Sequence, residues 1–465
     1  MISDTICAIS TPPGRGGIAV VRISGSEAFA ICNKIFKSVS GFPLRKDLKK
    51  ANIAFGRIFR GEEIIDEVLV STFQAPRSYT GEDVVEISCH GSLYIQQEIL
   101  KLTLANGCRL AAAGEFTQRA FFNGKLDLSQ AEAVGDLIAA SSAMSHRVAM
   151  QQMRGGFSHE LAALSDKLLN FTSLVELELD FSDEDVEFAD RKQLKDLALQ
   201  IATVICRLID SFGAGNAIKN GISVAIVGET NVGKSTLLNR LLRDEKAIVS
   251  DIHGTTRDVI EDTITIEGLL FRFIDTAGIR NTNDKIEQLG IERTFQKIEQ
   301  AAIVLWVIDL TQEIFDFRFL NFDWNIIKNQ KSKMILTLNK ADMLTNEERE
   351  QKTAYYSSLH DDYIVISAKS DADIAALERT LVETANIPQI GENDLIVTNL
   401  RHYEALSKAL SAIDNVIEGL DAGITGDFLS QDIRECLAHL NEITGKKIST
   451  EDVLGNIFSK FCIGK

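Results

Sequence analysis

One stretch, residues 228–236, most constrains what this chain of 465 residues can fold into. It reads Gly-Glu-Thr-Asn-Val-Gly-Lys-Ser-Thr and matches G-x-x-x-x-G-K-[ST], the pattern of a phosphate-binding loop. The apolar run 222–227 predicts a buried strand before it, and 237–242 predicts a helix after it. In that setting backbone N–H groups surround an anion at a helix N-terminus. We therefore expect Lys234 to reach the β- and γ-phosphates of a nucleotide and the Ser235 hydroxyl to bind Mg²⁺.

Further motifs follow other predicted strands in the order that is typical of a GTPase. A strand from residue 271 runs into Asp-Thr-Ala-Gly at 275–278, which is expected near Mg²⁺ and the γ-phosphate. A strand at 334–338 leads into Asn-Lys-Ala-Asp at 339–342. The carboxylate of Asp342 would accept two hydrogen bonds that guanine donates and adenine does not. Residues 364–369 supply a loop over the base, and the segment 254–258 reads as a switch loop whose Thr256 would bind Mg²⁺.

The group that would position the attacking water is not evident from these motifs. Ras-type sites carry Gln after Asp-x-x-Gly, whereas this chain has Ile279 there. Arg280, Asp284 and Glu287 are the polar candidates in the segment that follows. An arginine finger cannot be assigned, because Arg257 could equally form a surface ion pair. Another cation would then be needed to neutralise the charge that develops on the phosphates.

The periodicity of apolar residues divides the chain into regions. Residues 1–120 mix strands and helices without a regular βαβ alternation, so we expect an α+β domain. Apolar residues recur at helical spacing in 121–216 and again in 385–465, and neither part looks complete by itself. We therefore expect a helical-bundle domain that is discontinuous in sequence. A P-loop G domain of the Ras-like type interrupts it at 217–384, which makes the chain a multidomain α/β protein.

Composition excludes several classes of protein. The net charge of −17 argues against binding nucleic acid through overall charge, although a local basic face stays possible. The seven cysteines are scattered without a C-x-x-C pair, which is typical neither of a disulfide framework nor of a zinc site. They fit a reducing cytosol. We find no signal peptide and no apolar run of membrane-spanning length, so a cytoplasmic chain without membrane association is expected.

Motifs outside the G domain are more specific than the nucleotide motifs. They lie at 4–6, 11–18, 22–25, 79–84, 114–117, 123–128, 130–133 and 461–465. With them the chain resembles the tRNA-modifying GTPase family MnmE (TrmE) along nearly its whole length. The resemblance implies a K⁺-dependent, GTP-hydrolysing tRNA modification enzyme that acts with a flavin-dependent partner, MnmG (GidA), which carries FAD. Together they would add an aminomethyl-type (carboxymethylaminomethyl) group at C5 of the wobble uridine (U34) of certain tRNAs.

The resemblance also implies ligands and partners for the two ends of the chain. A tetrahydrofolate derivative, 5-formyl- or methylene-tetrahydrofolate, would supply the one-carbon unit. Its site would be lined by Arg22, Glu86, Lys125 and Lys465. Cys462 would take part in the modification chemistry, with an ordinary partly buried thiol as the alternative. The N-terminal domain would form a homodimer, within a heterotetramer-type complex with MnmG that acts on tRNA.

For hydrolysis, the resemblance places a K⁺ ion where an arginine finger would lie, and Glu287 as the group that orients the water. Thr230 is a departure, since many members carry Pro there, and the loop is expected to be slightly less rigid. The expected K⁺ ligands are Asn231, Ser250, Ile252 and Thr255. The residues expected to contact GTP are Asn231, Val232, Gly233, Lys234, Ser235, Thr236, Ser250, Asp251, Ile252, His253, Gly254, Thr255, Thr256, Asp275, Thr276, Ala277, Gly278, Asn339, Lys340, Asp342, Ser367, Ala368 and Lys369.

Two other functions share the same G domain. One is a GTP-switched, RNA-binding ribosome-assembly factor without modification activity, and the other is a regulatory GTPase that acts only through protein partners. Neither accounts for the folate-like N-terminal motifs or for residues 461–465. The sequence does not indicate which surface binds tRNA, because the basic run 44–50 is more typical of a solvated loop.

Overall fold

The computed structural model describes residues 4–44, 51–180, 191–242, 262–274, 301–314, 332–388, 391 and 394–445. The chain forms two compact units. Unit 1 comprises residues 1–138, 149–206 and 404–465, and unit 2 comprises 139–148 and 207–403. The predicted fold class is confirmed: an α+β N-terminal region, a helical bundle made from two parts of the sequence, and a P-loop G domain inserted between those parts.

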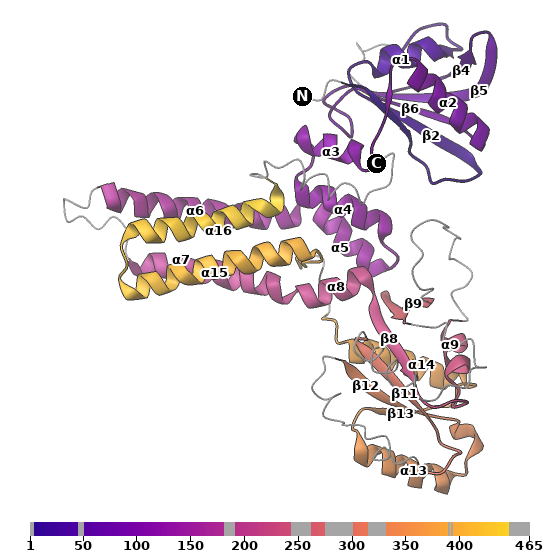
Figure 1. Ribbon diagram of the computed structural model, residues 1–465, viewed down its shortest axis with the longest axis vertical. Coiled ribbons are helices and arrows are strands. Elements are labelled where there is room, and N and C mark those ends of the chain that lie inside the picture. Colours follow the sequence, from indigo (N-terminus) through magenta and orange to yellow (C-terminus); the bar gives the residue numbers. More distant parts are fainter. Residues whose placement is uncertain are drawn as a thin grey trace. The chain divides into compact units, whose positions relative to one another are not determined.

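A seven-stranded sheet forms the N-terminal region of unit 1, with the strand order β3-β4-β5-β6-β2-β1-β7 (Figure 1). All the pairs described are antiparallel except β1 with β7. Alternate residues of its strands, such as Val21 and Ile87, are buried in a core with α1 and α2. The elements are β1 (Ile6–Ile9), β2 (Gly16–Ser24), α1 (Ala28–Ile35), β3 (Phe36–Ser38), β4 (Asn52–Arg60), β5 (Glu63–Phe73), β6 (Val84–Gly91), α2 (Leu93–Ala105), β7 (Arg109–Leu110) and α3 (Glu115–Phe122).

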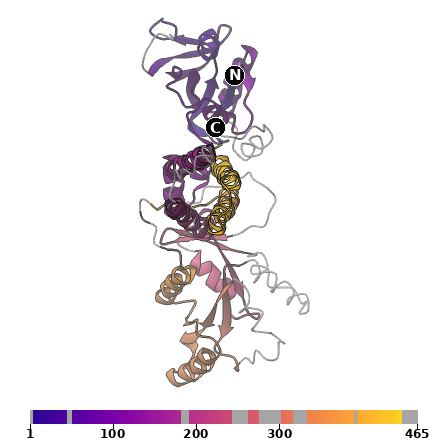
Figure 2. The ribbon, with the colours of Figure 1, turned by 90° about the vertical axis from the view of Figure 1, so that its left-hand side faces the viewer.

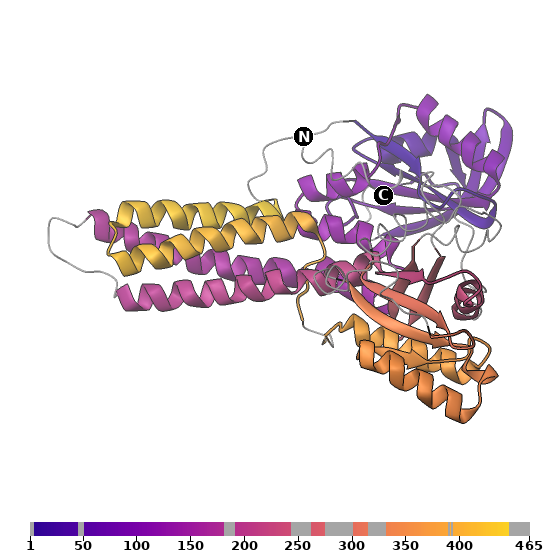
Figure 3. The ribbon, with the colours of Figure 1, turned by 60° about the horizontal axis from the view of Figure 1, so that its bottom comes forward.

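Long helices from two distant parts of the chain lie side by side in the bundle (Figures 1 and 3). Figure 2, which views the bundle nearly end-on, shows the purple and magenta helices of the first part beside the yellow helices of the second. The helices are α4 (Leu128–Ala139), α5 (Ala143–Met153), α6 (Gly156–Asp180), α7 (Arg191–Asp210), α15 (Leu400–Ala422) and α16 (Gly426–Thr444).

The bundle confirms the prediction of a helical domain that is discontinuous in sequence. The helices α6 and α16 pack directly against each other, although residues 181–425 separate them in the chain. On α16 the buried apolar side chains recur at helical spacing, at Leu429, Ile433, Leu437 and Leu440. Neither part of the sequence could bury such apolar faces alone.

One helical stretch, Arg191–Asn220, is long and apolar enough by length and composition to cross a membrane. This corrects the expectation that no run reaches that length. The stretch comprises α7 and the next helix, α8 (Phe212–Asn220). On α7, apolar side chains at helical spacing are buried, which is also the pattern of a bundle helix. These side chains are Leu194, Ala198, Ile201, Ile205 and Leu208.

A six-stranded sheet forms the centre of unit 2, with the order β13-β12-β11-β8-β10-β9. Its pairs are parallel except β9 with β10. Every residue of β11 is buried, as expected for a parallel strand that is covered on both faces. The elements are β8 (Ile222–Val227), α9 (Lys234–Leu241), β9 (Asp262–Ile266), β10 (Leu269–Phe273), β11 (Ile303–Asp309), β12 (Lys333–Asn339), η3 (Ala341–Met343), α13 (Asn346–Leu359), β13 (Tyr363–Val365) and α14 (Asp371–Ala385).

Candidate nucleotide site and a second polar site

The loop between β8 and α9 has a backbone that only this pattern of glycines permits. Gly228 and Gly233 have φ values of +145° and +104°. A Cβ atom at Gly228 would lie 2.3 Å from the carbonyl oxygen of Val307, and one at Gly233 would lie 2.3 Å from Nδ2 of Asn339. Asn231, between them, also has a positive φ of +64°. The glycines therefore allow both the turn and the close approach of neighbouring strands.

Lys234 begins α9 and turns its side chain back over this loop. Its Nζ donates hydrogen bonds to the carbonyl oxygens of Gly228, at 2.8 Å, and Glu229. Ser235 and Thr236 follow in the first turn of the helix. The ammonium group and the helix N-terminus both favour a bound anion. The residues present thus fit a polyphosphate, with the Ser235 hydroxyl as an oxygen ligand for Mg²⁺ beside it.

Two consecutive side chains at the end of β12 hold the phosphate loop. Asn339 donates from Nδ2 to the carbonyl oxygen of Val232 at 2.8 Å, and its Oδ1 accepts from the Ala368 amide at 3.0 Å. Lys340, which has a φ of +65°, donates from Nζ to the carbonyl oxygen of Asn231 at 2.9 Å. Asn339 is buried, and its side chain links the loop that follows β12 to both the phosphate loop and the loop at 367–369.

The predicted base loop lies beside these residues. The Ser367 amide donates to Oδ2 of Asp373 at 2.8 Å, which ties the loop to the first turn of α14. Asp342 lies in η3 and is exposed. The structure therefore brings 231–236, 339–342 and 367–369 together at the carboxyl ends of β8, β12 and β13. In open α/β sheets this edge is where ligands bind.

A second polar site lies on the N-terminal sheet. Arg22 and Glu86 are direct partners across β2 and β6. Nε and Nη2 of Arg22 both lie 2.8 Å from Oε1 of Glu86, and the two side chains are 19% and 26% exposed. The rings of Tyr79 and Phe116 have their centres 5.5 Å from the guanidinium carbon. Both aromatic rings, here called the aromatic walls, thus lie beside the Arg22 guanidinium.

The turn that carries Tyr79 also contacts Lys125. Burial raises the pKa of Tyr79 above its usual value, although its hydroxyl is hydrogen-bonded to Oγ1 of Thr117 at 2.8 Å and Arg22 lies nearby. Nζ of Lys125 donates to the carbonyl oxygen of Pro76 at 3.2 Å. Arg22 and Lys125 therefore contact the same turn. The aromatic walls were not among the predicted site residues, and their only signal was their place in the motifs 79–84 and 114–117.

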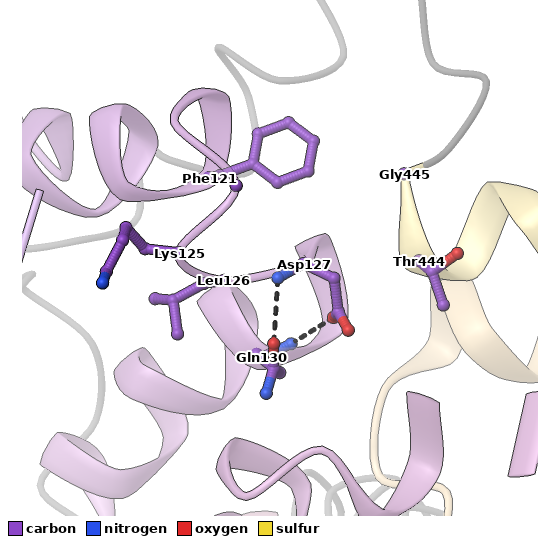
Figure 4. A pocket seen from close by; sticks show the side chains of 8 residues that line it. Phe121, Lys125, Leu126, Asp127, Gln130, Thr444 and Gly445 are labelled. Atoms are coloured by element: carbon purple, nitrogen blue, oxygen red, sulfur yellow. Dashed lines mark hydrogen bonds between the residues drawn. The ribbon is translucent and has the colours of Figure 1, made fainter. Parts of the chain in front are cut away.

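Lys125 also lines a pocket of about 390 Å³ (Figure 4). Asp127 and Gln130 form part of its wall, where the Asp127 amide donates to Oε1 of Gln130 at 3.0 Å. The end of α16, with Thr444 and Gly445, lies opposite. The other lining residues are Phe121, Gly124 and Leu126.

A buried arginine, Arg119, supports the turn that carries Tyr79 through its contact with Glu82. Arg119 is 1% exposed and contacts Asp4 at 2.7 Å, Glu115 at 3.0 Å and Glu82 at 3.2 Å. Glu82 also accepts a hydrogen bond from Oγ of Ser24 at 2.7 Å. Burial raises the pKa of Glu115, but hydrogen bonds from Arg109, the Ala112 amide and Arg119 outweigh burial and leave this pKa below its usual value. The Glu115 carboxylate is thereby held in the charged form.

Comparison with known proteins identifies the family. Residues 5–125 match the family model of the GTP-binding protein TrmE N-terminus, and residues 128–462 match that of the MnmE helical domain. The tRNA modification GTPase MnmE of Bacteroides thetaiotaomicron is 58% identical over 468 residues, which cover 100% of both chains. That of Christiangramia forsetii is 52% identical over 477 residues, again covering 100% of both. The chain belongs to the MnmE family. It is a GTP hydrolase of the tRNA modification class.

Two solved structures are similar to part of the chain. Era from Aquifex aeolicus is 30% identical and covers 41% of this chain and 66% of its own, with a TM-score of 0.28. The G domain of the T. maritima FeoB iron transporter is 23% identical and covers 36% of this chain and 99% of its own, with a TM-score of 0.25.

Part of the site expected for an MnmE-family protein lies outside the described residues. This holds for the predicted switch loop, for Asp-Thr-Ala-Gly, for the water-orienting group and for the C-terminal cysteine and lysine. These residues are Ser250, Asp251, Ile252, His253, Gly254, Thr255, Thr256, Asp275, Thr276, Ala277, Gly278, Glu287, Cys462 and Lys465.

Proposed function

We propose that this chain is a K⁺-dependent GTPase that acts with a flavin-dependent partner of the MnmG (GidA) class. Together they add an aminomethyl-type group at C5 of the wobble uridine of certain tRNAs. The observation that supports this most is that one chain carries both the loops expected to bind a guanine nucleotide and, in its N-terminal region, the Arg22–Glu86 pair with two aromatic rings beside Arg22. A GTPase that acts only as a switch needs the first site and has no use for the second.

In the G domain, each residue has a role that follows from its chemistry. Lys234 neutralises charge on the β- and γ-phosphates, and Asp342 accepts the paired hydrogen bonds of guanine. Ser235 and Thr256 are the proposed Mg²⁺ ligands. Glu287 is proposed to orient the attacking water. With GTP bound, Mg²⁺ would supply the fixed positive charge that the phosphates require.

The proposed K⁺ site centres on Asn231. Its main-chain carbonyl oxygen is already bound by Lys340, so its side-chain amide oxygen is the atom proposed for the cation. Asn231 is exposed at the loop surface, where such a ligand is accessible. Carbonyl-type oxygen is a suitable donor for a hard monovalent cation. Ser250, Ile252 and Thr255 are proposed to complete the ligand set.

The N-terminal site is proposed to bind a tetrahydrofolate derivative. Arg22 donates hydrogen bonds to Oε1 of Glu86, and the same carboxylate can also accept hydrogen bonds from the N–H groups of a pterin ring. Tyr79 and Phe116 offer apolar ring surfaces beside it. The cationic side chains of Lys125 and Lys465 suit the carboxylates of a folate tail. Cys462 is proposed to take part in the modification chemistry.

We also propose the assembly in which the chain works. The N-terminal domain would form a homodimer, and two partner flavoproteins with FAD would join it in a heterotetramer-type complex that binds tRNA. None of the cysteines in the described part of the chain forms a disulfide, which agrees with the proposed cytoplasmic location.

The decisive experiment is nucleoside analysis of tRNA from cells that lack the gene. We expect unmodified wobble uridine, restored by the wild-type gene and not by Lys234→Ala or Arg22→Gln. Arg57→Gln, which changes an exposed ion pair on the same sheet, should restore the modification fully. Unchanged wobble uridines in the deletion strain would rule out the proposal. Equal GTP turnover of the purified protein in K⁺ and Na⁺ would remove Asn231 from its proposed role.

A further inference from the structure

The phosphate loop is held in its conformation by contacts to two consecutive carbonyl groups. Lys340 binds the carbonyl of Asn231, and Asn339 binds the carbonyl of Val232. Asn231 in particular needs this support, because it is a non-glycine residue with a positive φ of +64°. Backbone in this region persists only where surrounding contacts fix it.

A buried carboxylate on the neighbouring strand controls one of these contacts. Asp309 is the last residue of β11 and lies directly opposite Asn339 of β12. Its side chain is 3% exposed, and its Oδ2 lies 2.6 Å from Nζ of Lys340. Its Oδ1 accepts hydrogen bonds from the amide and the hydroxyl of Thr311, at 2.9 and 2.7 Å. The carboxylate is thus fixed on one side and presents its other oxygen to Lys340.

We propose that Asp309 is a positioning residue that acts through Lys340 to keep the phosphate loop in its anion-binding form. The Lys340 ammonium is shared between this carboxylate and the Asn231 carbonyl. Lys340 is 29% exposed, so without the carboxylate its flexible side chain turns toward water. The phosphate loop then loses the hydrogen bond from Lys340 to the carbonyl oxygen of Asn231. A smaller population in the binding form lowers the apparent affinity for nucleotide by the same fraction.

Electrostatics supports this arrangement. Burial raises the pKa of Asp309, but hydrogen bonds from Lys340 and Thr311 outweigh burial and leave this pKa below its usual value. The Asp309 carboxylate is therefore charged at neutral pH. A charged pair with one side buried is costly to break, because Asp309 has no second ion pair among the described residues. The proposal rests on the proposed nucleotide site and adds Asp309, which none of the nucleotide motifs contains.

The test is the affinity of the full chain for fluorescent mant-GDP. Asp309→Asn keeps the shape of the side chain and removes its charge, and we expect binding about tenfold weaker, which equals about 1.4 kcal/mol. Thr311→Val is the matched control, because it removes a hydrogen bond to the same carboxylate on the side away from Lys340. It should stay within about twofold of the wild type. Equal affinity of a folded Asp309→Asn protein would overturn the proposal.

A double-mutant cycle separates positioning from a general loss of structure. In a Lys340→Met background, adding Asp309→Asn should change mant-GDP affinity by less than about twofold, because the route through Lys340 is already cut. A further tenfold loss would overturn the proposal. This comparison remains decisive if Asp309→Asn alone fails to fold, since the double variant leaves no unpaired buried charge. A wild-type chain that does not bind mant-GDP would instead refute the proposed nucleotide site.

Discussion

The two sheets of this chain place their polar residues in opposite ways. In the G domain β11 is buried along its whole length, and the polar side chains Asp309 and Asn339 lie at the ends of their strands. In the N-terminal sheet, β4 and β5 alternate between buried and more exposed residues. There the polar pair Arg22–Glu86 lies within the strands.

This difference follows from what covers each sheet. A parallel sheet with both faces buried leaves its strand ends as the place for polar groups. An antiparallel sheet with one covered face can carry an ion pair in the middle of a strand. The G-domain site therefore depends on loops that follow several different strands. The N-terminal site depends instead on the register of β2 and β6 and on the Arg119 cluster, which supports the turn that carries Tyr79.

The largest effect is expected from Arg119→Met, which removes the buried cation from three carboxylates. Arg109 still pairs with Asp4 and Glu115, but Glu82 loses its cation and the space of a buried guanidinium is left without hydrogen bonds, so unit 1 should be destabilised by about 3–5 kcal/mol. Denaturant unfolding followed by circular dichroism would show an earlier first transition. Mant-GDP binding should persist at denaturant concentrations that unfold the N-terminal sheet, because the cluster and the described nucleotide loops belong to different compact units.

The control for this prediction is Arg57→Met. Arg57 pairs with Glu67 on the same sheet, but the two side chains are 47% and 50% exposed. Its loss should cost less than about 1 kcal/mol. If Arg119→Met lowered the free energy of unfolding no more than Arg57→Met, the turn that carries Tyr79 would not depend on the buried cluster. The contrast drawn between the two sheets would then be wrong.

The next largest effect is expected from Gly233→Ala in the phosphate loop. The new Cβ would clash with Asn339 and the backbone would be strained at a φ of +104°. A cost of about 3 kcal/mol weakens mant-GDP binding roughly 100-fold. Gly213→Ala is the matched control, because a Cβ there meets nothing within 4 Å and lies in helix α8. Normal affinity in Gly233→Ala would mean that Asn339 does not fix the loop.

The same contrast explains how much could be predicted from the sequence. The strand at 222–227 was predicted with the observed bounds, and the strand at 334–338 within one residue of them at each end, because buried parallel strands are continuous apolar runs. The strand β4 was not predicted, because its apolar residues are interrupted by Gly56 and Arg57 and its pattern is weak. The edge strand β9 was missed as well, since it is short and polar at alternate positions.

Residue contacts between distant segments could not be predicted at all. Phe116 meets Arg22 only after α3 returns to the sheet, and Asp309 meets Lys340 only once β11 and β12 align. Neither pair has a spacing in the sequence that indicates contact. The nucleotide motifs were visible because their residues lie within single loops, and the folate-site residues were named only through the family resemblance.

A moderate effect is expected from Arg22→Gln on the N-terminal site. The variant loses the charge that holds Glu86 in place while keeping a polar side chain. Loss of a charge-assisted contact should weaken binding of 5-formyltetrahydrofolate by about tenfold, as measured by isothermal titration calorimetry. Mant-GDP binding should not change. Unaltered folate binding would show that the Arg22–Glu86 pair is not part of the folate site. Arg57→Gln, on the same sheet, again serves as the control.

The smallest effect comes from two matched helix caps in the G domain. Ser370 caps α14 by accepting a hydrogen bond from the Asp373 amide, and Thr345 caps α13 in a capping box with Glu348. Replacing either residue with Ala should cost about 1 kcal/mol of stability.

Only the Ser370 cap is coupled to the nucleotide site, because Asp373 in the same turn binds the Ser367 amide of the base loop. Ser370→Ala should therefore weaken mant-GDP binding by about threefold, whereas Thr345→Ala should leave it unchanged. Melting temperatures measured alongside would show that both caps were lost to a similar extent. Equal affinity in the two variants would mean that the base loop is held by Asn339 alone, and that the strand ends position this site without help from the helices that follow them.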